Sequence, residues 1–85
     1  MLRGRTMIVI YTQENTIIRN DANAAKRDLI SLYGEKLGEE AYAAVKNGRI
    51  GAVYQKYGGP LVKVVSKGDA KEIREKEVRI GMNIK

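Results

Sequence analysis

The sequence predicts one α+β domain in which two helices pack on one face of a mostly antiparallel sheet of four to five strands. Three observations support this class. A short apolar run at residues 7–11 is typical of a buried strand, residues 22–45 repeat apolar positions at helical spacing, and residues 49–67 form two extended segments around a pair of glycines. The predicted order of elements is strand, short strand, helix, helix, strand, strand, short helix, strand.

The first strand is expected at residues 6–12, where β-branched and apolar residues follow one another without alternation. Such a run is typical of a central strand that is covered on both faces. A turn at residues 13–15 then leads to a short returning strand at residues 16–19.

Two amphipathic helices follow these strands. Residues 22–33 place apolar side chains three and four positions apart, Asp21 and its neighbours are suitable N-caps, and Gly34 is a suitable stop. The second helix is expected after Gly38, with acidic residues in its first turn and an end at Asn47-Gly48. The apolar stripes of both helices should supply the core.

Residues 49–57 and 61–67 are predicted to pair as a hairpin around a loop at residues 58–60. The expected register pairs Val53 with Val65. Because a slip by one residue would move Lys63 onto the apolar face, the pattern itself favours this register. The face opposite the apolar residues is then polar and basic, and it carries Arg49, Gln55, Tyr57, Lys63 and Lys67.

The last part of the chain is predicted to form a short helix and a strand. Residues 70–76 are highly charged and should form a short exposed helix after a turn at Gly68-Asp69. Residues 78–85 alternate strictly between apolar and polar, which is typical of a strand with one buried face. This strand would add Arg79 to the basic face of the sheet.

The composition excludes several classes of site. The chain has no cysteine and no histidine, so it cannot form a disulfide, a thiol nucleophile, a Cys/His zinc site or the usual general base near neutral pH. We therefore predict no catalytic residue, no cofactor and no metal site.

Residues 1–6 are predicted to be a flexible basic arm that carries Arg3 and Arg5, and residues 7–85 to be the domain. The apolar run at residues 7–11 is far too short to cross a bilayer, and nothing near it matches a signal peptide. These features predict a cytoplasmic protein that has no membrane partner.

The charge distribution suggests a function. The formal net charge is +6, and the segment from Ala41 to Gly68 contains no acidic residue. Lysines and arginines on one sheet face can neutralise phosphates, and an exposed tyrosine can stack on an unpaired base. The leading hypothesis is a small non-enzymatic domain that binds DNA or RNA, with contacts from Arg49, Tyr57, Lys63, Lys67 and Arg79.

Other functions fit the same residues. Antiparallel sheets often present a solvated polar face, and lysines on strands discourage aggregation, so the basic face need not bind anything. The chain could instead be an interaction or dimerisation module, such as a viral or plasmid inhibitor, that uses an exposed strand edge. A third alternative is a histidine-free endoribonuclease of the toxin type, which would use Arg49, Tyr54 and Lys67.

Overall fold

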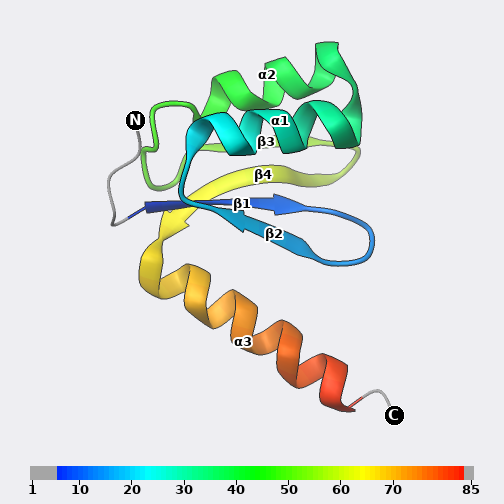
Figure 1. The fold of residues 1–85 in the computed structure, drawn as a ribbon, viewed down its shortest axis with the longest axis vertical. Coiled ribbons are helices and arrows are strands. Elements are labelled where there is room, and N and C mark those ends of the chain that lie inside the picture. Colours follow the sequence, from blue (N-terminus) through cyan, green and yellow to red (C-terminus); the bar gives the residue numbers. More distant parts are fainter. Residues whose placement is uncertain (1–5, 84–85) are drawn as a thin grey trace.

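An antiparallel sheet of four strands lies between two helices on one side and a third helix on the other (Figure 1). The computed structural model describes residues 6–83, and for residues 77–83 it describes the backbone alone. The predicted α+β class is confirmed. In chain order the elements are β1 (Thr6–Tyr11), β2 (Thr16–Arg19), α1 (Ala22–Tyr33), α2 (Glu35–Val45), β3 (Val53–Lys56), β4 (Gly59–Ser66) and α3 (Lys67–Asn83).

The two central strands, β1 and β4, carry the core on both of their faces. The strand order is β2-β1-β4-β3, and the central pair places Ile8 opposite Val64 and Ile10 opposite Val62. These four side chains are buried against α1 and α2, whereas Val9 faces the other side and packs with Val65 of β4 and Ala70 of α3. As predicted for a strand covered on both faces, Ile8, Val9 and Ile10 are all fully buried.

Helix α2 begins earlier than the sequence predicted, and it packs closely against α1. The Asp21 side chain caps α1 by accepting a hydrogen bond from the Asn23 N–H at 3.1 Å. Gly34 (φ 90°) separates the helices, so α2 starts at Glu35 and contains Gly38 within it. Gly38 is buried where α2 meets α1, because only a residue without a Cβ fits against the backbone of Ile30 there.

The β3–β4 hairpin turns at a different place from the one predicted. Tyr57 (φ 57°) and Gly58 (φ 86°) form a two-residue turn, and the predicted loop residues Gly59 and Pro60 already belong to β4. Two consecutive positive φ values match the twist of a hairpin, as in a type I′ turn. Residues 49–52 precede β3 and form a loop rather than part of a strand.

The register of this hairpin differs from the prediction by two residues. Val53 lies opposite Lys63 rather than Val65, and Tyr54 lies opposite Val62. Because side chains alternate between faces, a shift of two residues leaves each one on its predicted face. Beyond Tyr54 the pairing shifts again at a bulge, so that Gln55 lies opposite Pro60.

The predicted strand at residues 78–85 is wrong over its described part. A single helix, α3, runs from Lys67 to Asn83, and residues 84–85 lie outside the described residues. Between Asp69 and Ile80 the chain has no proline or glycine, and oppositely charged residues stand four positions apart in the sequence at Lys71 and Glu75 and at Glu72 and Lys76. This run favours continued helix over a new edge strand.

Helix α3 is fixed to the sheet at its N-terminal end. The Ser66 hydroxyl, at the end of β4, accepts a hydrogen bond from the Asp69 N–H at 3.1 Å, which is typical of an N-cap. Ala70 and Ile73 then pack against the outer sheet face. Within residues 6–83, no helix is both long and apolar enough to cross a membrane.

Candidate nucleic-acid interface

Lys63 is the one predicted site residue that lies in the middle of the sheet. It faces the α3 side of β4, between Val9 of β1 and Val53 of β3. Its Nζ lies 5.7 Å from the ring centroid of Tyr11, which is within the range of a cation–π contact. Lys63 is half-buried, so its aliphatic part covers the sheet while its ammonium group lies near the aromatic ring.

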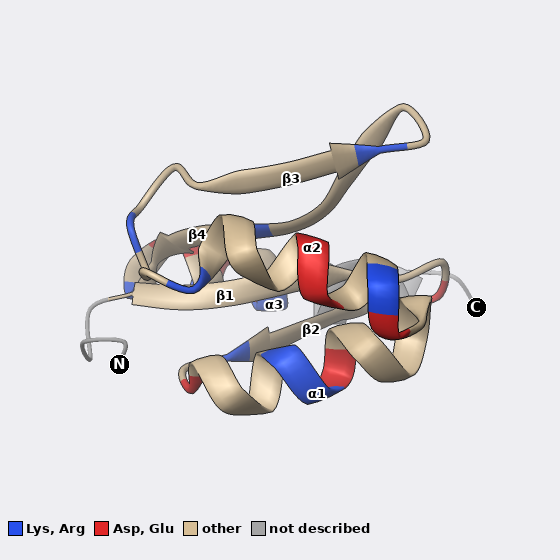
Figure 2. Cartoon of the chain, turned by 90° about the horizontal axis from the view of Figure 1, so that it is seen from above, with Lys and Arg blue, Asp and Glu red and all other residues tan. Residues whose placement is uncertain are grey.

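Arg49 and Lys67 lie toward the same end of β4. Lys67 is the first residue of α3, directly after the end of β4, and it is exposed. Arg49 is exposed in the loop from α2 to β3, which is joined to this end of β4 by the Gly51 N–H and the Val64 carbonyl at 3.0 Å. Figure 2 shows basic segments in this loop and where β4 passes into α3.

Tyr57 lies at the other end of the hairpin. It is 81% exposed in the β3–β4 turn, and the Lys56 Nζ lies 5.9 Å from its ring centroid. The eight residues of β4 separate it from Lys67, a span of about 26 Å at ~3.3 Å per residue. The Arg79 side chain lies outside the described residues. The predicted set therefore spreads along β4 and does not form one compact patch.

The first turns of α3 carry a basic stripe that the sequence prediction missed. Lys67, Lys71 and Arg74 are spaced by four and three positions, so they lie within about 60° of one another around the helix axis and span ~10 Å along it. All three are exposed, and none forms an ion pair with another described residue. By contrast, Arg19 is neutralised by Asp28, whose Oδ2 lies 2.5 Å from its Nε.

The described acids of α3, which are Asp69, Glu72 and Glu75, form no ion pair with this stripe. Asp69 and Glu72 project from a different side of the helix, at roughly 200° and 140° from Lys67, and Ala70 and Ile73 face the sheet. Glu75 lies closer, about 40° around the axis from Lys71, but the two side chains form no ion pair. The spacing of the three cations was visible in the sequence. This spacing places the three side chains on one face only if a single helix begins at Lys67, whereas the prediction ended a strand there.

An apolar groove lies beside the basic stripe. Met7 of β1, Ile18 of β2 and Ala70 of α3 line it, and Lys67, Lys71 and Arg74 form its rim. Its volume is about 540 Å³. The structure thus brings accessible apolar surface together with positive charge that has no ion-pair partner among residues 6–76.

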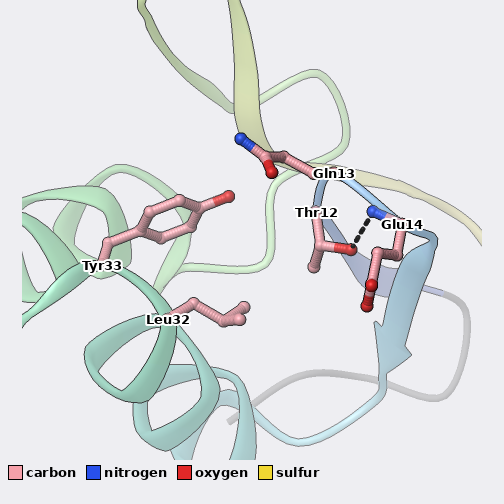
Figure 3. Close-up of a pocket in the computed structure, with 5 residues that line it drawn as sticks. All are labelled: Thr12, Gln13, Glu14, Leu32 and Tyr33. Atoms are coloured by element: carbon pink, nitrogen blue, oxygen red, sulfur yellow. Dashed lines mark hydrogen bonds between the residues drawn. The ribbon is translucent and has the colours of Figure 1, made fainter.

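A second cavity, of about 350 Å³, lies between the β1–β2 turn and the end of α1 (Figure 3). Its polar groups stabilise the turn. The Tyr33 hydroxyl donates to the Tyr11 carbonyl, and the Thr12 hydroxyl accepts from the backbone N–H groups of Glu14 and Asn15. Burial raises the pKa of Tyr33 above its ordinary value. These contacts account for the positions of the Thr12 and Tyr33 hydroxyls without a ligand.

The residues of the ribonuclease alternative do not converge. The Tyr54 hydroxyl donates to Glu40 Oε1 at 3.0 Å, and this hydrogen bond raises the pKa of Tyr54. Tyr54 packs with the α1–α2 core, whereas Lys67 begins the helix on the opposite side of the sheet. Among the residues that the structure describes, no three His, Cys, Asp or Glu side chains are grouped as a metal site would require.

Comparison with protein-family models, with curated proteins and with solved structures finds no match to this chain in any of the three.

Proposed function

We propose that this protein binds nucleic acid through the phosphate backbone and catalyses no reaction. The observation that carries the proposal is the basic stripe of Lys67, Lys71 and Arg74, which is exposed and has no acidic partner among the described residues. Cations of this kind bind a polyanion by displacing its condensed counterions. Backbone contacts of this type position a nucleic acid but do not read its sequence.

The predicted residues Arg49 and Lys63 extend the proposed interface. Arg49 is exposed near the start of α3, and Lys63 lies farther along the outer face of β4. Tyr57 stays a candidate for stacking on a base, but a bound nucleic-acid strand would have to run along β4 from Lys67 to reach it. The excess of positive charge, +6 in total, adds a long-range attraction to polyanions.

The decisive experiment is a salt titration of the wild-type protein with a labelled oligonucleotide of mixed sequence. Binding measured by fluorescence anisotropy is expected at low salt and should weaken steeply between about 50 and 200 mM salt. For three to five contacts with a single strand, the slope of log K against log salt should be about −2 to −3.5. If neither DNA nor RNA binds at the lowest salt, the proposal is wrong.

Exposed apolar residues favour self-association as a second function. Ile50 (57% exposed), Val53 (41%) and Tyr57 (81%) all lie in or beside β3, which is an edge strand. An edge strand of this kind can pair with the same strand of a second copy. Such pairing would join two four-stranded sheets into one.

Sedimentation analysis would test this second function. The wild type is expected to form a concentration-dependent dimer, and Val53→Lys should weaken it because like charges would be brought together at the paired edges. Val53→Thr retains a β-branched residue and serves as the control. A wild type that stays monomeric at high concentration would argue against pairing through β3.

A further inference from the structure

The groove beside α3 has a composition that neither phosphate binding nor core packing requires. Met7 and Ile18 are half-buried residues of the outer sheet face, and both pack against the small cluster of Val9, Val65 and Ala70. The described residues leave a space of about 540 Å³ above them. A cavity of this size is within the roughly 300–1,000 Å³ range of ligand sites.

The walls of the groove combine apolar surface with positive charge at the rim. Lysine and arginine side chains commonly place their aliphatic stems along apolar surface and keep their charged ends in water. Lys67, Lys71 and Arg74 line this groove and are exposed, in agreement with that arrangement. The occupant should therefore have an apolar face and carry negative charge next to it.

The positive charge at the rim distinguishes between the molecules that could occupy the groove. A second copy that docked with the same groove would place one basic stripe against another, and the like charges would repel. Duplex nucleic acid supplies phosphates, but its bases are stacked inside and offer no face to the groove. Single-stranded nucleic acid supplies both the apolar face and the negative charge, because each unpaired base has an accessible face and lies between two phosphates.

We propose that this groove holds an unpaired nucleobase, so that the α3 site prefers single-stranded nucleic acid to duplex. The inference rests on the proposed backbone binding and adds the class of substrate. The phosphates on either side of the base meet the cations at the rim, and the base lies against Met7 and Ile18. Apolar side chains serve this role in other base-binding pockets.

The test compares two single strands with equal numbers of phosphates, one with normal bases and one that is abasic throughout. Anisotropy at a fixed low salt concentration is expected to show about tenfold tighter binding of the strand with bases. Ile18→Thr should bring the ratio of the two affinities close to one, since it makes the groove floor more polar and leaves all charges in place.

Ile17→Thr is the matched control. Ile17 is the neighbour of Ile18 on β2 and is also half-buried, but it packs against the α1–α2 core on the other face of the sheet. The control should keep the tenfold ratio. Met7→Thr repeats the test from β1, so the result does not depend on one variant remaining folded.

The outcomes separate the two proposals. If both strands bind equally to the wild type, or if Ile18→Thr and Met7→Thr leave the ratio unchanged, the groove does not hold a base while backbone binding stands. If neither strand binds at low salt, the proposed function fails and this inference fails with it.

Discussion

Replacing Lys67, Lys71 and Arg74 together by alanine is expected to remove most of the affinity of this protein for nucleic acid. Each contact with a phosphate of a single strand contributes about 0.7 to the slope of log K against log salt, so the slope should become shallower by about two. Between about 50 and 200 mM salt, three such contacts correspond to a change of roughly twentyfold in affinity. Alanine is the best helix former, so α3 should persist.

The control for this variant has the same net charge. Arg27, Lys36 and Lys46 are exposed residues of α1, α2 and the turn after α2, on the other side of the sheet from α3. Alanine at these three positions also lowers the formal charge from +6 by three, to +3. The control should keep nearly the full salt slope. Equal losses in both triple variants would mean that the overall charge attracts the nucleic acid and that α3 is no specific site.

The central part of the fold could be predicted because its signals do not conflict. The apolar run of β1 fits a strand covered on both faces, and the three- and four-residue spacing of α1 fits a helix with one buried side. Residues 22–33 form the helix as predicted. In such segments local preference and tertiary packing favour the same structure.

The final segment was mispredicted because two patterns compete in it. Residues 78–84 alternate between apolar and polar, which favours a strand, but they follow a charged run that strongly favours a helix. A strand is stable only where it can form backbone hydrogen bonds with the edge strand of a sheet. The alternation of apolar and polar residues does not show whether such an edge is available. In the structure the helix continues to Asn83 and the edge strands are β2 and β3.

The site was predicted only in part because it depends on that helix. Lys67 was placed at the end of a strand, where its outward neighbours are Lys63 and Val65 rather than Lys71 and Arg74. Once α3 begins at Lys67, the residue predicted at the end of a strand and the two predicted in a short exposed helix form one stripe. The hairpin error had a smaller effect, since a two-residue shift leaves Lys63 on its predicted face.

Gly38→Ala is expected to destabilise the fold by about 2 kcal/mol, even though alanine favours a helix over glycine by up to ~1 kcal/mol. A Cβ at this position would lie 2.6 Å from the Ile30 Cα and 2.7 Å from the Ile30 backbone nitrogen. Backbone atoms cannot rotate away, so α1 and α2 must move apart, and the core cluster that contains Leu29 of α1 and Ala41 of α2 must loosen. Urea denaturation should give a midpoint lower by roughly 1–2 M.

Gly59→Ala is the matched control for this prediction. Gly59 has no positive φ, and a Cβ there would meet nothing within 4 Å, so its replacement should leave the midpoint unchanged or slightly higher. Equal midpoints for the two variants would contradict the close approach of the helices at Gly38. Because α1 and α2 cover the face of the sheet opposite α3, Gly38→Ala should also leave the nucleic-acid affinity of the folded protein unchanged. Stability and binding would then be separable properties of the two sides of the sheet.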